Sequence, residues 1–119
     1  MHLCDTNSTE MKNIEIIMIP VADQQKAKEF YFNLGFKIII EAPSHHGQTW
    51  IQLGLPNDPT TISLANFQGI IIQTDNIEQE ITALREKGIT VAQIDETPWG
   101  KFAWLKDLDH NRLCLHQKN

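Results

Sequence analysis

The chain has 119 residues, a net charge of −5 and no cluster of basic residues. It is therefore long enough for one compact domain, and it lacks the positive stripe that binding to nucleic acid or to an anionic membrane surface requires. Hydrophobic residues make up 41% of the sequence, and no apolar run approaches the roughly 20 residues of a membrane-spanning helix. We therefore expect neither a nucleic-acid partner nor a membrane partner.

The N-terminal residues 1–12 are polar and are expected to form a disordered or frayed tail before a single domain over residues 13–119. They contain no apolar stretch of the kind found in a signal peptide. The two cysteines are Cys4 in this tail and Cys114 in a late apolar stretch, which indicates two thiols rather than a structural disulfide. The sequence therefore predicts a cytoplasmic protein.

In the first half, NIEIIMIPV from Asn13 has the β-branched, apolar composition of a strand. Asp23 is suited to cap a helix over QQKAKEFYFNL, and Gly35 can supply the left-handed residue that ends it. The spacing of the apolar residues in this helix predicts one buried stripe, made of Ala27, Phe30, Tyr31 and Leu34. FKIII, QTWIQLGL and TTISLANF then predict three further strands.

The second half repeats this order. GIIIQT predicts a strand, Asp75 or Asn76 can cap the helix IEQEITALREK, and Gly88 ends that helix before a predicted strand ITVAQI. The apolar face of the helix consists of Ile77, Ile81 and Leu84. GKFAWLK and NRLCLHQ predict the last two strands, separated by DLDH. Gly35 and Gly88 are 53 residues apart, and the same offset relates Ile16 to Gly69, which indicates a duplicated module.

The predicted fold is therefore α+β, with module 1 over residues 13–67 and module 2 over residues 68–119. Each module has the order βαβββ, so its single helix can cover only one face of its strands. The other face must be closed by curvature, by the other module or by a second subunit. A cupped mixed sheet around a central cavity satisfies this requirement.

The stretch VADQQKAKEFYFNLGFKII resembles the opening of the vicinal oxygen chelate superfamily, which includes glyoxalase I, bleomycin-resistance proteins, fosfomycin-resistance enzymes and extradiol dioxygenases. The matching residues are Asp23, Phe30, Tyr31, Leu34, Gly35 and Phe36. Near the C-terminus, Asp107, Asp109 and Asn111 match the usual Asp-Pro-Asp-Gly-Asn turn, with Leu108 and His110 at the other two positions. The resemblance implies two βαβββ modules, a cavity and a homodimer.

Metal-dependent members of this superfamily carry four ligands, typically His and Glu, on four strands. The corresponding positions here are Ile16, Ser63, Gly69 and Cys114. These four residues cannot make that site, so we expect no metal and no cofactor. His45 and His46 lie in a polar loop and His110 in an acidic turn, contexts more typical of solvated histidines than of a shared metal.

The cavity wall is predicted from strand alternation. One set of positions comprises Ile14, Ile16 and Met18, a second comprises Gly69, Ile71 and Gln73, and a third comprises Arg112, Cys114 and His116. Trp50 shares a strand face with Gln52, and Trp104 shares one with Phe102 and Lys106, whereas Trp99 could form a rim. The candidate ligand-binding residues are Met18, Trp50, Gln52, Gln73, Trp99, Trp104 and Cys114. Trp104 could equally be a core residue.

Three functions are compatible with these residues. The first is a metal-free module, similar to bleomycin-resistance-type binders, that holds an aromatic and perhaps cationic small molecule in a dimer-associated cavity. The second is a glyoxalase-type lyase, isomerase or dioxygenase that uses non-standard ligands or a Cys114 nucleophile. The third is a protein–protein module whose cavity is filled by its own side chains.

Overall fold

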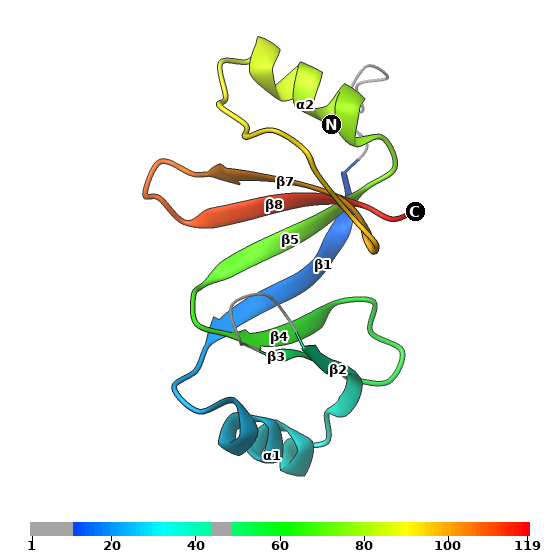
Figure 1. The fold of residues 1–119 in the computed structure, drawn as a ribbon, viewed down its shortest axis with the longest axis vertical. Coiled ribbons are helices and arrows are strands. Elements are labelled where there is room, and N and C mark those ends of the chain that lie inside the picture. Colours follow the sequence, from blue (N-terminus) through cyan, green and yellow to red (C-terminus); the bar gives the residue numbers. More distant parts are fainter. Residues whose placement is uncertain (1–10, 44–48) are drawn as a thin grey trace, which may run out of the picture. The chain divides into compact units, whose positions relative to one another are not determined.

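The computed structural model describes residues 11–43 and 49–119 (Figure 1). The first module comprises β1 (Met11–Pro20), α1 (Gln24–Leu34), β2 (Lys37–Pro43), β3 (Thr49–Gly54) and β4 (Thr61–Ala65). The second comprises β5 (Gly69–Thr74), α2 (Ile77–Glu86), β6 (Asp95–Thr97), β7 (Gly100–Lys106) and β8 (Arg112–Gln117). The order βαβββ thus occurs twice, as predicted, although β1 already begins at Met11, inside the predicted tail.

All eight strands belong to one sheet with the order β2-β3-β4-β1-β5-β8-β7-β6. The sheet is mixed, because β1 pairs with β4 in parallel whereas β2–β3, β3–β4, β6–β7 and β7–β8 are antiparallel pairs. The predicted α+β fold class is therefore confirmed. The part of the chain that the structure describes contains no helix that is long and apolar enough to cross a membrane.

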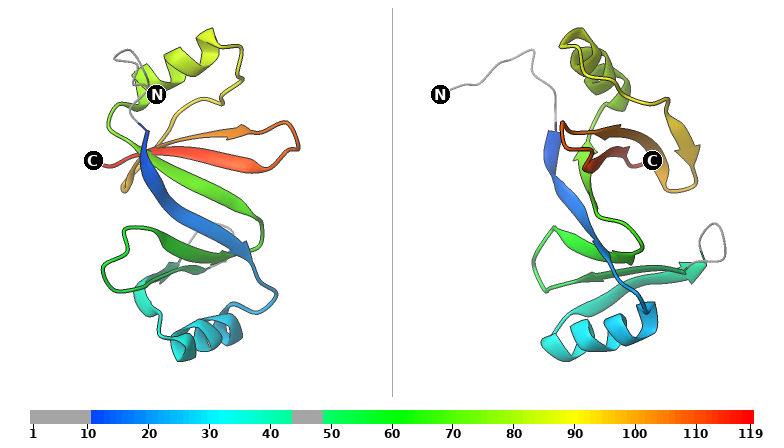
Figure 2. Two further views of the ribbon diagram at one scale, coloured as in Figure 1. Left: turned by 180° about the vertical axis from the view of Figure 1, so that it is seen from behind. Right: turned by 90° about the vertical axis from the view of Figure 1, so that its left-hand side faces the viewer.

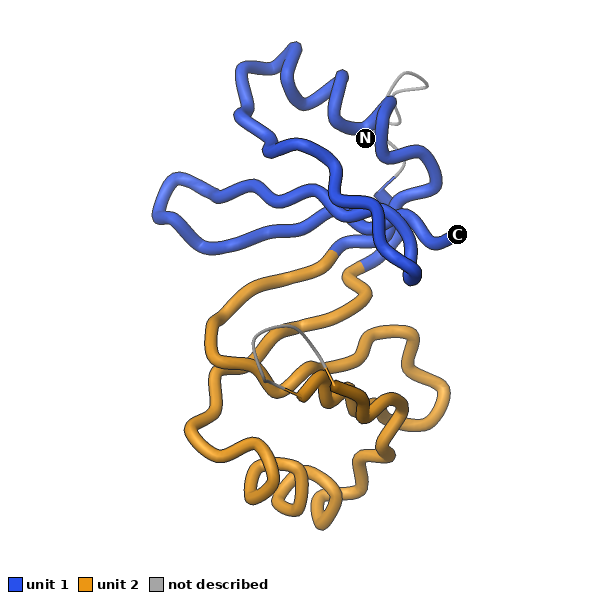
Figure 3. The backbone as a smooth tube through the Cα atoms, viewed as in Figure 1, with its two compact units in different colours: residues 1–13, 72–119 blue, residues 14–71 orange. Residues whose placement is uncertain are grey.

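The chain divides into two compact units, which Figure 3 shows in different colours. One unit consists of residues 14–71, and the other includes residues 11–13 and 72–119. The division falls within β1 and β5, so these two strands contribute residues to both units. Each unit has its own helix and its own hydrophobic core.

In the unit of residues 14–71, α1 packs against β3 and β4. As predicted, Asp23 caps the helix by accepting a 3.1 Å hydrogen bond from the Lys26 amide, and Gly35 ends it with a φ of 115°. The core between helix and sheet consists of Ile51, Leu53 and Leu64, with Ala27, Tyr31 and Phe36 packed against it.

The predicted apolar stripe of α1 is only half right. Ala27 and Tyr31, four residues apart, contact the core, whereas Phe30 and Leu34 are each 61% exposed. The helix lies on its strands along a narrow line that the Ala27–Tyr31 pair fills. Phe30 instead packs edge-on against the Tyr31 ring, with the ring centroids 5.6 Å apart, and Leu34 is the last residue of the helix.

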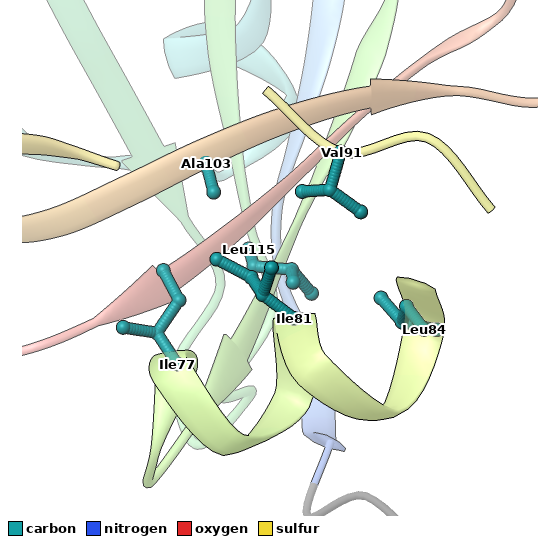
Figure 4. Packing of buried hydrophobic residues seen from close by; sticks show 6 residues of the cluster. All are labelled: Ile77, Ile81, Leu84, Val91, Ala103 and Leu115. Carbon is teal, nitrogen blue, oxygen red and sulfur yellow. The ribbon is translucent and has the colours of Figure 1, made fainter. Parts of the chain in front are cut away.

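In the other unit, α2 packs against β7 and β8, as both views in Figure 2 show. Asn76 is the residue that caps the helix, through a 3.1 Å bond from the Gln79 amide to its Oδ1. Figure 4 shows the core that α2 forms with the sheet. It consists of Ile77, Ile81, Leu84, Val91, Ala103 and Leu115. The predicted apolar face of the second helix is therefore confirmed.

The predicted strand ITVAQI, residues 89–94, is wrong, because the strand at this place is the three-residue β6 (Asp95–Thr97). The β-branched residues of this segment serve the core beneath α2: Val91 is buried there, with Ile89 and Ile94 packed against it. Its backbone is held by Arg85, whose Nη2 donates a 2.9 Å bond to the Val91 carbonyl, and by one bond from the Ala92 amide to the Trp104 carbonyl. The apolar pattern thus reflects burial and not strand pairing.

Candidate functional site

The sheet face opposite α1 gathers side chains from β1, β3 and β4. Gln52 and Met18 are both paired with Ser63, so these three side chains form one row across the strands. Thr61 is paired with Ile16 in the next row, and Trp50 lies two residues before Gln52 on the same side of β3. We call this set the first distal face; it consists of Ile16, Met18, Trp50, Gln52, Thr61 and Ser63.

A directional chain of hydrogen bonds crosses the first distal face. The indole Nε1 of Trp50 donates to Gln52 Oε1 at 3.0 Å, and Gln52 Nε2 donates to Thr61 Oγ1 at 2.9 Å. The Thr61 hydroxyl then donates to the backbone carbonyl of Glu15 at 3.0 Å. Because an indole N–H can only donate and a carbonyl can only accept, the direction of every bond in the chain is fixed. Trp50, which is half-buried, is therefore held by its edge.

Ser63 lies beside this chain but does not belong to it. Its side chain is 0% exposed, and its Oγ has no hydrogen-bond partner within residues 11–43 and 49–119. Thr61, two residues earlier on the same face of β4, both accepts and donates a hydrogen bond. The first distal face thus combines one indole ring, one amide that bonds on both sides and one buried hydroxyl that bonds to no described group.

Apolar side chains flank these groups along the edge strand β2. Ile40 is paired with Gln52, and a bulge between Ile38 and Ile40 places Ile39 over Gly54. A Cβ built on Gly54 would lie 2.7 Å from Ile39 Cδ1, so the glycine makes room for this side chain. Together with Ile39 and Ile40, the first distal face is therefore an apolar surface with a few polar points, a composition typical of small-molecule sites.

The sheet face opposite α2 carries a second group of side chains from β7 and β8. His116 is paired with Phe102 and Cys114 with Trp104. We call these four residues the second distal face. The rings of Phe102 and His116 are stacked, with centroids 4.1 Å apart and planes 4° apart. His116 Nε2 lies 2.9 Å from the Trp99 carbonyl oxygen, which can only accept, so this nitrogen carries a proton.

Trp99 lies in the turn between β6 and β7, and its side chain is 61% exposed. The backbone of the turn is held firmly: Thr97 Oγ1 donates to the Gly100 carbonyl at 2.8 Å and accepts from the Trp99 amide at 3.1 Å. Asn119 Nδ2 donates to the Pro98 carbonyl at 2.8 Å. The backbone of Trp99 is therefore held in place, and its ring is exposed.

The structure places the predicted ligand-binding residues in two groups. Met18, Trp50 and Gln52 lie together on the first distal face. Trp104 and Cys114 are paired on the second, and Trp104 lies on the opposite face of β7 from Ala103, which packs in the α2 core. Gln73 is on β5, on the opposite face from Ile72, which packs against that core. Of the predicted wall positions, Ile16 and Met18 are buried whereas Ile14 is exposed.

The two histidines of the polar loop, His45 and His46, lie outside the described residues. His110 adopts a φ of 67°, the unusual backbone angle expected where it stands in place of glycine. The acidic turn around it is held by Asp107: Oδ1 accepts from the Asp109 and Asn111 amides, and Oδ2 accepts from Asn111 Nδ2 at 2.9 Å. The bonds from the Asn111 side chain and amide lower the pKa of Asp107 below its usual value.

Cys114 is a poor candidate for a nucleophile, because a reactive thiol must be accessible as a thiolate. Its side chain is 0% exposed, and its Sγ donates to the Leu115 carbonyl at 3.5 Å. Arg112, the nearest cation along the strand, is exposed.

The residues at the four positions that correspond to the superfamily's metal ligands do not fit a divalent ion. Ile16 and Gly69 offer no donor atom, and Ser63 offers a neutral hydroxyl. Within the described residues, no three His, Cys, Asp or Glu side chains are grouped so that they could hold a metal. Metal chemistry at these positions is therefore not supported by the donor set.

Sequence comparison places the chain in a family. The profile described as "Glyoxalase/Bleomycin resistance protein/Dioxygenase superfamily" matches residues 13–115. The chain belongs to this family, and the resemblance found in its motifs is confirmed. A relative from Bacillus subtilis (strain 168), the uncharacterized protein YetH, is 24% identical over 119 residues, which covers 90% of this chain and 99% of YetH.

Two solved structures are similar to this chain, one in its fold and the other in its sequence. Methylmalonyl-CoA epimerase from Mycobacterium tuberculosis has a TM-score of 0.83 and 16% identity, with 99% of this chain and 94% of that chain covered. The antibiotic binding protein TnmS3 from Streptomyces sp. CB03234 is 30% identical, with 92% of this chain and 98% of that chain covered, at a TM-score of 0.45. The likeness to the epimerase supports the fold alone, and the function depends on the site.

Sequence reasoning missed one residue of the first distal face and one contact of the second distal face. Thr61 was read only as part of a strand, although alternation places it on the same face as Ser63. The Phe102–His116 stack joins residues from two strands whose register follows from the length of the acidic turn. Thr61 could have been found by extending the alternation along β4. The Phe102–His116 stack could have been found by pairing the strands on either side of Asp107.

Proposed function

We propose that this protein is a metal-free binding module for a flat aromatic small molecule, and that Trp50 on the first distal face provides the stacking surface. The observation that carries the proposal is the bond from Trp50 Nε1 to Gln52 Oε1, because it holds the ring by its edge. The π-face of an indole held in this way can stack on an aromatic ligand without a further loss of side-chain freedom.

The surroundings of Trp50 support an apolar ligand with a positive charge. Ile40 and Met18, in the row of Gln52 and Ser63, and Ile39 at Gly54 add apolar surface to the sheet face that carries the indole. The net charge of −5 favours a cation over an anion, and an indole face attracts cations through its quadrupole. We further propose, from the family, that the protein works as a cytoplasmic homodimer whose subunits share the cavity; light scattering tests the dimer.

Calorimetric titration with naphthalen-2-ylmethylammonium, which is flat, cationic and soluble, tests the proposal. Trp50→Ala should weaken binding roughly 5- to 150-fold, since stacking on an aromatic side chain contributes about 1–3 kcal/mol. The matched control is Phe30→Ala, which removes another aromatic ring, 61% exposed on α1, and should leave the affinity unchanged. Equal affinity of Trp50→Ala and the wild type would overturn the proposal. It would also be overturned if the wild type bound neither this probe nor its neutral counterpart naphthalen-2-ylmethanol.

A further inference from the structure

We propose that the hydroxyl of Ser63 hydrogen-bonds to the bound molecule and thereby selects aromatic ligands with a hydroxyl or carbonyl oxygen on the ring edge. This inference rests on the proposed function, and it adds a polar contact that determines specificity. The observation behind it is the Ser63 Oγ, which is fully buried and has no hydrogen-bond partner among the residues that the structure describes.

A buried hydroxyl without a partner is unfavourable. Leaving such a group unsatisfied costs about 1–3 kcal/mol, and the large majority of buried polar groups in proteins have a partner. Thr61 shows that the same strand can satisfy a hydroxyl, because its Oγ1 both accepts from Gln52 and donates to the Glu15 carbonyl. The hydroxyl of Ser63 thus retains a hydrogen-bonding capacity that an external group can use.

The position of Ser63 relative to Trp50 fits a single ligand that touches both. Ser63 is paired with Gln52, and Trp50 lies two residues from Gln52 on the same side of β3. Trp50 and Ser63 are therefore diagonal neighbours on one sheet face, a relationship that separates Cα atoms by about 7–8 Å. A bicyclic ring that stacks on the indole can span this distance and bring its edge to the Ser63 hydroxyl.

In the row of Gln52, Ser63 and Met18, the Ser63 hydroxyl is the polar group with hydrogen-bonding capacity left for a ligand. Gln52 uses Oε1 for Trp50 and Nε2 for Thr61, so its amide is already held from both sides. Met18, on the other side of Ser63, has an unbranched side chain that can rearrange to admit a ring edge. A serine hydroxyl can donate as well as accept, so phenol-type hydroxyls and ring carbonyls both fit it.

The experiment compares two probes that differ by one hydroxyl, naphthalen-2-ylmethylammonium and its 6-hydroxy derivative, by calorimetric titration of the full chain. Ser63→Ala should weaken binding of the hydroxylated probe about 2- to 12-fold, the range for one neutral hydrogen bond, and leave the unsubstituted probe within about 2-fold. Thr82→Ala, which removes an exposed hydroxyl from α2, is the matched control and should change neither affinity.

The outcomes separate this inference from the proposed function. If Ser63→Ala weakens both probes equally or neither of them, Ser63 is not a ligand contact, and the inference is overturned while Trp50-dependent binding stands. If the wild-type protein binds neither probe, the proposed function fails for flat aromatic cations, and this inference fails with it. Circular dichroism of Ser63→Ala should match the wild type, and a changed spectrum would count against a contact role.

Discussion

The indole Nε1 of Trp50 donates a 3.0 Å hydrogen bond to Oε1 of Gln52, which lies two residues further along β3. Gln52 is itself held, because its Nε2 donates to Thr61 Oγ1 on the neighbouring strand. The orientation of the indole thus depends on a contact between strands and not on Trp50 alone. Gln52 acts as a positioning residue for the ring.

Gln52→Leu should therefore weaken binding of naphthalen-2-ylmethylammonium although the aromatic ring remains. The loss should be about 2- to 12-fold, because one neutral hydrogen bond contributes about 0.5–1.5 kcal/mol. Fluorescence anisotropy of Trp50, measured in a background with Trp99 and Trp104 replaced by Phe, should fall as the indole gains freedom. Gln25→Leu is the control, since Gln25 on α1 donates to the exposed Glu41 of β2 and lies away from the indole. Unchanged anisotropy in Gln52→Leu would refute the positioning role.

Two hydroxyls on β4 should respond to removal with opposite signs. Thr61→Val should lower the free energy of unfolding by about 1–3 kcal/mol, because Gln52 Nε2 and the Glu15 carbonyl both lose a partner. Ser63→Ala should raise it by up to about 1 kcal/mol, because a buried hydroxyl without a described partner is removed. Urea denaturation of both variants measures the two changes. Destabilisation by Ser63→Ala as large as that by Thr61→Val would mean that the Ser63 hydroxyl is satisfied in the folded protein.

Most of the fold could be predicted from local sequence signals such as helix-capping residues. Asp23, Gly35 and Asn76 act through the backbone within three or four residues, so their roles as helix ends could be predicted from the sequence. Residues 89–94 show the limit of such signals, since Val91 is buried beneath a helix instead of being paired in a ladder. A β-branched run has the same composition in either setting, and tertiary packing decides between them.

The site was predictable only in part for a related reason. Alternation along single strands placed Trp50 with Gln52 and Trp104 with Phe102, because side-chain direction is a local property. The bond from Gln52 to Thr61 depends on the register between β3 and β4, which the lengths of the connecting loops determine. The proposed role of Ser63 depends on the lack of a hydrogen-bond partner for its hydroxyl among the described residues. This can be seen only in the structure.

The burial of Cys114 predicts slow thiol chemistry. In a Cys4→Ser background, iodoacetamide should modify Cys114 at least about 100-fold more slowly in buffer than in denaturant, because a buried thiol reacts only when the structure opens. Mass spectrometry of the alkylated protein over time measures both rates. A rate in buffer close to that in denaturant would restore Cys114 as a candidate nucleophile.

Two glycines with positive φ should differ in their tolerance of a side chain. Gly100 has a φ of 127°, and a Cβ there would collide with the backbone carbonyl of Gln117. Gly35 has a φ of 115°, but a Cβ there would meet no described atom within 4 Å. Gly35→Ala should cost about 1 kcal/mol for the backbone strain alone, whereas Gly100→Ala should cost about 3 kcal/mol or more and displace the Trp99 turn. Thermal unfolding compares the two variants, and equal costs would show that the turn can move away from β8.

The hydrogen bonds to Asp107 predict a pH-dependent contribution of the acidic turn to stability. The bonds from Asn111 and the Asp109 amide lower the pKa of Asp107 in the folded state below its usual value. A lowered pKa means that the folded protein favours the ionised carboxylate, so this stabilisation is fully present above the unfolded pKa of about 4 and is lost as the pH falls through the folded value.

Asp107→Asn, which places an amide N–H₂ where Oδ2 accepts from Asn111 Nδ2, should therefore lower the melting temperature at pH 7. The difference from the wild type should shrink as the pH falls below about 4, as measured by thermal unfolding at each pH. Asp109→Asn changes the same charge in the same exposed turn and serves as the control; if it reproduces the profile of Asp107→Asn, the effect comes from net charge and not from the bonds that Asp107 accepts.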